Sequence, residues 1–342
     1  MLCLTTRSRV DTMTAMRAMA ESAAGGGYPV PMRLPRLDRE TVNQLPRLSF
    51  GQRAADILNL LLGTGLTGWD VECAVGRNPV SLHTVGRRVR LAEAWHNPQW
   101  AFSWFTEQLT ARLTGKTAAP EGWAGIAVRL AMLFGVFGEL GADGLDWDRP
   151  MDVSVAAGDF SAPLSLWYGR EMGLPIGTVI CCCNENGGLW ELLRYGQLEP
   201  GGEIVRTSLP DCDRAVPDRL ECLIFETLGP EETERYTRAI RTGGVYTLSP
   251  EKRTRLGRGL WTAVVGAGRV QDLLRGAYRA DGYVMDPYGA LAYGGLQDYR
   301  AGSGVAGDAL LWSEQAPSRM PALIRRSLGL TDSTPGFRPT ER

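Results

Sequence analysis

From residue 150 onward, short apolar runs of strand length alternate with longer amphipathic segments, and this alternation limits the folds available to the chain. The strand-like runs are 153–157, 179–183, 261–265 and 310–312. The segments with helical periodicity are 163–172, 188–195, 216–228, 230–241, 269–280 and 317–328. Alternating strands and helices are typical of an α/β fold with a mainly parallel sheet. We therefore expect a mainly parallel sheet flanked by helices.

The first half of the chain carries helix signals. Ser49 with Gln52 three positions later has the pattern of a capping box, and Gly63 can end the helix that follows. Asn97, directly before a proline, indicates a second helix start, because proline at the first helical position loses no hydrogen bond. A polar break follows that helix, and a further helix is expected at about 123–140.

The balance of charged and apolar residues excludes several classes of protein. The 342 residues include 37 basic and 38 acidic ones, so the chain lacks the positive field that nonspecific nucleic-acid binding needs. The most apolar window, 126–138, is interrupted by Arg129 and is too short to span a membrane. The first apolar run is too short for a signal peptide, because Arg7 and Arg9 follow it at once. These features predict a cytoplasmic protein that binds neither nucleic acid nor a membrane.

The cysteines and histidines do not predict a metal site. Three of the seven cysteines are consecutive, at 181–183, and consecutive strand residues point to opposite faces of a sheet. The chain has two histidines, too few for a site built from several imidazoles. We therefore expect the cysteine run to be free thiols in the core and no metal to be bound.

The loop at 158–163 lies between an expected strand and an expected helix, where two alternatives are open. The free N–H groups and the positive end of a helix can bind an anion there. Alternatively, the loop is a simple strand-to-helix turn in which Asp159 or Ser161 caps the helix. These residues alone favour the simple turn.

The region around this loop contains a longer series of motifs in a fixed order. The series comprises Gly158, Phe160, 172–176, 184–186 and Gly196. In order and spacing this stretch resembles threonine synthase, a pyridoxal-phosphate (PLP) enzyme of the tryptophan-synthase-β fold type. Shorter similarities extend the resemblance over nearly the whole chain, at 5–7, 26–31, 48–50, 216–228 and 282–287.

The resemblance implies a PLP fold type II protein from a family that converts O-phosphohomoserine to threonine and phosphate. It implies a threonine-synthase-like N-terminal domain at 1–90, a PLP-type α/β domain at 91–330 and a flexible tail at 331–342. In the family, a smaller lobe with an S-G-D-T-G substrate loop lies between the catalytic lysine and the phosphate loop. The corresponding interval is short here, so we expect that lobe to be largely deleted near 114–122.

The segment that resembles the family's catalytic motif, E-L-F-H-G-P-T-L-A-F-K-D, lacks its lysine. The matching residues are Glu93, His96, Pro98, Ala101 and Phe102. Ser103 stands at the position of the lysine that forms the Schiff base with PLP in the family, and a hydroxyl cannot form that imine. The only lysines of the sequence, Lys116 and Lys252, match no family motif. By resemblance, His96 and Asn97 belong to the substrate region.

The positions that correspond to the family's cofactor-binding residues are changed as well. The phosphate loop G-N-F-G-D of the family becomes Gly158-Asp159-Phe160-Ser161-Ala162 here. A carboxylate at Asp159 repels a phosphate group. The threonine that partners the pyridine nitrogen in the family falls at Glu314, or at Ser313 if the register slips by one.

These departures predict a non-catalytic relative of threonine synthase with a binding or regulatory role and no bound PLP. The expected partners are a true threonine synthase or a second copy of the chain. One alternative is a working PLP-dependent threonine synthase in threonine biosynthesis. Another is a module that binds a small anion or an amino acid near Gly158.

Overall fold

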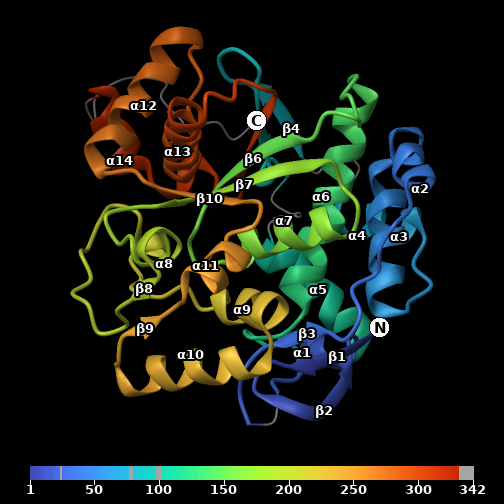
Figure 1. Cartoon of the computed structure of the whole chain (residues 1–342). Helices are drawn as coiled ribbons and strands as arrows, with labels where there is room; N and C mark the ends of the chain where they lie inside the picture. Colours follow the sequence, from blue (N-terminus) through green and yellow to red (C-terminus); the bar gives the residue numbers. More distant parts are fainter. Residues whose placement is uncertain (24, 77–79, 98–101, 331–342) are drawn as a thin grey trace.

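The computed structural model describes residues 1–330 except 24, 77–79 and 98–101, and its main feature is a six-stranded sheet (Figure 1). The strands in spatial order are β10 (Leu260–Val264), β7 (Ile176–Cys183), β6 (Met151–Ala156), β11 (Ala309–Ser313), β5 (Val89–Glu93) and β4 (Ser81–Thr84). Five strands run parallel, and β4 at one edge pairs antiparallel with β5. The expected mainly parallel α/β sheet is confirmed.

Helices cover both faces of this sheet (Figure 1). On one side lie α3 (Phe50–Leu62), α4 (Gly68–Val75), α5 (Phe102–Thr114), α6 (Ala124–Ala142) and α7 (Ser161–Glu171). On the other side lie α12 (Ala267–Asp281), α13 (Pro287–Ser303) and α14 (Pro321–Leu328). Because side chains alternate along a strand, Cys181 and Cys183 of β7 pack on the first side, whereas Ile180 and Cys182 pack on the second. The three consecutive cysteines are buried free thiols, as expected.

The helix α6 is the most apolar helix of the core. It has the length and hydropathy of a membrane-crossing helix, but most of it is buried inside the protein, between α3 and α7. Arg129 interrupts its apolar sequence and is itself largely covered. The composition of α6 therefore reflects its place in the core.

A second, three-stranded sheet lies at the N-terminal side. It consists of β1 (Leu2–Thr5), β2 (Ser8–Thr14) and β3 (Pro29–Pro31), all antiparallel, and α1 (Arg17–Ala20) follows β2. Arg7 after β1 forms an ion pair of 2.8 Å with the buried carboxylate of Glu221, in α9 (Leu220–Leu228). This contact fixes the small sheet against the rest of the molecule.

The remaining elements are short or peripheral. They are α2 (Arg39–Gln44), α8 (Gly188–Tyr195), α10 (Pro230–Thr242), α11 (Pro250–Leu256), the two-residue strands β8 (Gln197–Leu198) and β9 (Tyr246–Thr247), and 3-10 turns at Leu45–Arg47, Pro210–Cys212 and Pro317–Arg319. Residue 90, the expected domain boundary, lies inside β5 of the main sheet. The expected tail at 331–342 lies outside the described residues.

Most expected elements of the second half of the chain are present within a few residues of their expected ends. Ser49 caps α3 by accepting from the N–H of Gln52, and Gly63 ends it in the left-handed conformation, as expected. The Gln52 side chain instead donates to Asp56, so the reciprocal half of the expected capping box is absent there. The helices expected from 216 and 317 begin later, at 220 and 321.

The sequence analysis missed α13 and the strands before residue 100. Gly294 and Gly295 weaken the helical pattern of α13, yet they let it approach the sheet closely. A Cβ atom at Gly295 would collide with the Sγ atom of Cys182, and one at Gly294 would meet Val265. The glycines that obscure this helix in the sequence are therefore the residues that allow it to pack.

Candidate functional site

The candidate site lies at the carboxyl-terminal edge of the main sheet. The strands β5, β11 and β6 are neighbours and run parallel, so the segments that follow them meet at one edge. Ala94 after β5 donates its N–H to the carbonyl of Ser313, at 2.9 Å. Ala157 after β6 donates to the carbonyl of Cys182, also in a neighbouring strand, at 2.8 Å. In open α/β sheets, ligands bind at this edge.

The loop after β6 folds back on its own carboxylate. Asp159 Oδ1 accepts from the N–H of Ser161 at 2.9 Å, and the Ser161 hydroxyl donates to Asp159 Oδ2 at 2.7 Å. Phe160 is fully buried and adopts a positive φ of 71°, which positions the start of α7. The Asp159 carboxylate thus accepts from the first backbone N–H group of α7, at the helix end where an external anion would bind. The loop is a short strand-to-helix turn, but the residue at the cap position is Phe160, whereas the simple-turn alternative predicts Asp159 or Ser161.

Glu314, directly after β11, forms the strongest charge contact of the site. Arg129 of α6 binds it with two nitrogens, Nε to Oε1 at 3.0 Å and Nη2 to Oε2 at 2.8 Å. The Trp312 indole N–H also donates to Glu314 Oε1, at 2.9 Å. Both charged side chains are 17% exposed, so the pair is mostly shielded from water. Two parallel hydrogen bonds and partial burial make this a well-positioned ion pair.

A cavity of about 240 Å³ lies between the loop and this ion pair. Its walls include Arg129, Gly158, Asp159, Ala162, Tyr288 and Glu314. Burial raises the pKa of Asp159, but the nearby guanidinium of Arg129 and the hydrogen bonds from Ser161 outweigh burial and lower it below its usual value. The Arg129 guanidinium therefore acts on two carboxylates of the cavity wall, Asp159 and Glu314.

Ser313 points away from this cavity into a buried network. Its hydroxyl donates to Asp286 Oδ2 at 2.5 Å and accepts from the Trp95 indole N–H at 3.0 Å. Asp286 also caps α13 by accepting from Tyr288 and Gly289 N–H groups at 2.9 Å. Burial raises the pKa of Asp286 to about 6, although these hydrogen bonds act in the opposite direction. Ser313 and Asp286 therefore hold β11 against α13.

The residues expected in the substrate and lysine segment lie apart from the cavity. His96 Nδ1 is 3.6 Å from Glu93 Oε2, and Asn97 donates to the carbonyl of Val75 at 3.0 Å. Ser103 lies in the first turn of α5 with an exposed side chain. None of His96, Asn97 and Ser103 is among the described residues that line the cavity. Residues 98–101, which complete this segment, lie outside the described residues.

Both lysines form ion pairs away from the sheet-edge cavity. Lys116 Nζ is 2.7 Å from Glu21 Oε1, near the N-terminal sheet. Lys252 of α11 pairs with the buried carboxylate of Glu232 in α10. Neither lysine is among the described residues that line the cavity.

The sequence did not predict Arg129 as a site residue, because in the sequence it only interrupts an apolar segment. A lone guanidinium inside a core helix needs a partner, because an unpaired buried charge is costly. That signal predicts a buried carboxylate near α6, although it does not say which one.

The sheet order, the flanking helices and the site at the carboxyl edge define an α/β protein of PLP fold type II. The PLP-bound threonine synthase of Brucella melitensis superimposes with a TM-score of 0.86 at 18% identity, covering 98% of this chain and 93% of that one. The yeast threonine synthase gives a TM-score of 0.83 at 16% identity, covering 97% and 90%. These matches confirm the fold that the resemblance implied.

Sequence comparisons also match threonine synthases and threonine synthase-like proteins. The human protein "Threonine synthase-like 1" is 24% identical over 152 residues, or 43% of this chain and 20% of that protein. The threonine synthase of Corynebacterium glutamicum is 31% identical over 102 residues, or 28% of this chain and 21% of that protein. The matched parts thus span about a fifth of these two relatives. No protein-family model matches the chain. The chain is therefore similar in sequence and in fold to the threonine synthases, as its motifs indicated.

Proposed function

We propose that this chain is a threonine synthase-like protein without Schiff-base catalysis, which has a binding or regulatory role. The observation that carries this proposal is the ion pair between Arg129 and Glu314 in the cavity at the sheet edge. Glu314 stands where the family has the partner of the pyridine nitrogen, and here it is committed to a guanidinium of the same chain.

The residues of the cavity do not fit PLP held as in the family. Covalent attachment needs a primary amine, and the position of the family's lysine is the exposed Ser103. The two lysines form ion pairs at other places. A cofactor phosphate at ~4 Å from the Asp159 carboxylate would face a repulsion of about 4 kcal/mol at an effective dielectric constant of 20. These features support a site that has lost the cofactor.

The alternative is a PLP-dependent threonine synthase that converts O-phosphohomoserine to threonine and phosphate. The fold and the family motifs around Gly158 favour it. It requires PLP to be attached to Lys116, to Lys252 or to a lysine from another chain. It also requires a replacement for the smaller lobe, which we infer to be deleted. The non-catalytic function fits the internal ion pair better. We propose a cytoplasmic location, and a true threonine synthase or a second copy of the chain as partner.

Reduction with borohydride in the presence of PLP tests the proposal. We expect the purified chain to show no stoichiometric adduct and no absorbance of an internal aldimine. Lys116→Arg and Lys252→Arg are matched controls, because each removes one amine and keeps the charge of its ion pair. A single stoichiometric adduct that disappears in one of these variants, together with threonine formation from O-phosphohomoserine, would establish the enzyme instead.

Size-exclusion chromatography and pull-down with the threonine synthase of the source cell test the partners. We expect either a dimer of this chain or a complex with the synthase. A monomer that captures no synthase would contradict both proposed partners.

A further inference from the structure

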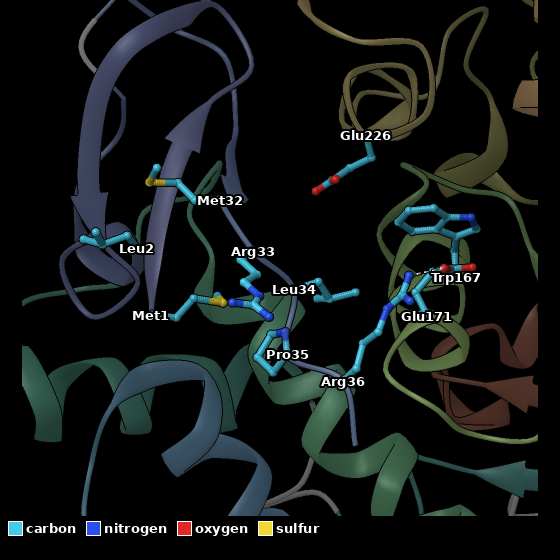
Figure 2. A pocket seen from close by; sticks show the side chains of 10 residues that line it. All are labelled: Met1, Leu2, Met32, Arg33, Leu34, Pro35, Arg36, Trp167, Glu171 and Glu226. Atoms are coloured by element: carbon cyan, nitrogen blue, oxygen red, sulfur yellow. Dashed lines mark ion pairs between the residues drawn. The ribbon is translucent and has the colours of Figure 1, made fainter. Parts of the chain in front are cut away.

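A second, larger groove lies far from the sheet edge, between the N-terminal sheet and the helices α7 and α9 (Figure 2). Its volume is about 1080 Å³. Leu2 of β1 and the segment Met32, Leu34 and Pro35 after β3 form one side, and Trp167 of α7 lies opposite. The groove is therefore walled mainly by apolar side chains.

One carboxylate enters this apolar groove. Figure 2 shows the Glu226 side chain of α9 pointing into the space between Trp167 and the segment 32–36. The Tyr168 hydroxyl donates to Glu226 Oε1 at 2.8 Å. In the part of the chain that the structure describes, no side-chain cation and no terminal amine forms an ion pair with Glu226.

Two more deeply buried glutamates of the same region have cationic partners. Glu221, five residues earlier in α9, pairs with Arg7 at 2.8 Å. Glu232 pairs with both Arg235 and Lys252. Glu226 differs from both because its one described polar contact is a neutral hydroxyl. A cation that enters the groove would supply the missing partner.

The surroundings of Glu226 also favour the binding of a cation there. Burial raises the pKa of Glu226 to about 7, and the hydrogen bond from Tyr168 offsets only part of that rise. The groups that face Glu226 are the buried thiols of Cys3 in β1 and Cys222 in α9 and the Tyr168 hydroxyl of α7, and the carboxylate of Glu226 helps to raise the pKa of each of them. At the rim, Arg36 Nη2 lies 3.6 Å from Glu171 Oε2, and Arg33 adds a second positive charge.

We propose that this groove binds a small aliphatic monoamine, with its ammonium at Glu226 and its carbon chain between Trp167 and Leu34. A buried carboxylate attracts the ammonium, while the indole and the aliphatic wall exclude water from the chain. At the rim, Arg33 and Arg36 outnumber the carboxylate of Glu171, so the net positive charge there favours a monoamine over a diamine. This site is independent of the sheet-edge cavity and of the proposed function.

Calorimetric titration at pH 8 with n-hexylamine tests the proposal. We expect saturable binding of hexylamine, weaker binding of 1,6-diaminohexane, and none of 1-hexanol or hexanoate at the same concentrations. Glu226→Gln should weaken hexylamine binding by about tenfold or more, which corresponds to a loss of about 1.4 kcal/mol. Glu171→Gln, at the rim of the same groove, is the matched control and should keep the affinity within about threefold.

Three results would overturn the proposal. One is the absence of hexylamine binding at millimolar concentrations in the folded wild-type chain. The others are equal binding of hexylamine and hexanol, and hexylamine binding that Glu226→Gln leaves unchanged, because either would show a groove that is merely apolar. Total tryptophan fluorescence locates the ligand: we expect hexylamine to change it in the wild type and not in the variant Trp167→Leu.

Discussion

The two cavities of this protein each contain a carboxylate beside an indole, but they differ in where the positive charge comes from. At the sheet edge, Glu314 lies beside Trp312 and is paired with Arg129 from α6. In the groove, Glu226 lies near Trp167, and within the described residues it accepts a hydrogen bond from the Tyr168 hydroxyl. A carboxylate that forms an ion pair within the chain has little affinity for an added cation. A carboxylate whose partner is a neutral hydroxyl can still bind one.

The two cavities also differ in their relation to the threonine synthase resemblance. The resemblance implies a cofactor site at the sheet edge, where Glu314 and Asp159 have hydrogen-bond partners within this chain. The groove uses the N-terminal sheet and α9, away from that edge. We therefore expect the groove at Glu226 to bind an added cation and the cavity at Glu314 not to bind one.

The largest expected effect comes from breaking the internal ion pair. Glu314→Ala leaves Arg129 buried without its partner and should lower the free energy of unfolding by about 3–5 kcal/mol. Urea unfolding measures this loss. Added formate should restore part of the stability by occupying the place of the lost carboxylate. Asp308→Ala, which breaks the exposed pair with Arg88, should cost far less.

A double replacement tests whether the ion pair matters as a pair. Arg129→Leu combined with Glu314→Leu removes both charges and should recover most of the stability that Glu314→Ala loses. A double variant as unstable as the single one would mean that the loss comes from packing and not from the unpaired guanidinium.

The pH dependence of Glu226 tests the open groove. Its pKa rises from 4.5 to about 7 on folding, so the fold favours the protonated form. This contribution is fully present below pH 4.5 and is lost as the pH rises through about 7. Glu226→Gln should therefore exceed the wild type in unfolding free energy by at most about 3 kcal/mol at pH 8. Urea unfolding between pH 4 and 9 checks the sign; equal stability at every pH would show that this carboxyl is not destabilised by burial.

A smaller effect is expected for the loop at the sheet edge. Asp159→Asn keeps the shape but weakens the hydrogen bonds to Ser161 and removes the attraction to Arg129, at a cost of about 1 kcal/mol. The pKa of Asp159 is lowered from 3.8 by folding, so its contribution is present above pH 3.8 and disappears as the pH falls below it. Unfolding curves at pH 7 and pH 3 should differ accordingly between wild type and variant.

The smallest effect is expected for a restored lysine. Ser103→Lys places an amine on the exposed first turn of α5, outside the described lining of the cavity. We expect no internal aldimine with PLP and no more borohydride-trapped adduct than Gln108→Lys, at an exposed position of the same helix. A strong, specific aldimine at residue 103 would show that α5 moves toward the sheet edge.

Local patterns predicted the elements that depend on local interactions. The cap at Ser49, the end at Gly63 and the helix Gly188–Tyr195 occur as expected, because their hydrogen bonds and apolar stripes involve neighbours in the sequence. The strand β5 and the helix α13 were missed. β5 is recognised only when it pairs with β11, more than 200 positions later, and α13 owes its position to glycines that lower its helical propensity.

The sequence alone indicated the class of fold and, by resemblance, the positions at which the chain departs from the threonine synthases. Period-two and period-3.6 patterns predicted a mainly parallel α/β sheet, and the resemblance predicted a hydroxyl in place of an amine at 103 and new acids at 159 and 314. How those acids are paired became visible in the folded chain. Arg129 and Glu314 are 185 positions apart, and they meet because α6 packs beside the carboxyl end of β11. Among the residues that the structure describes, Glu226 accepts a hydrogen bond from the Tyr168 hydroxyl and forms no ion pair, because such contacts depend on packing across the chain and not on neighbours along it.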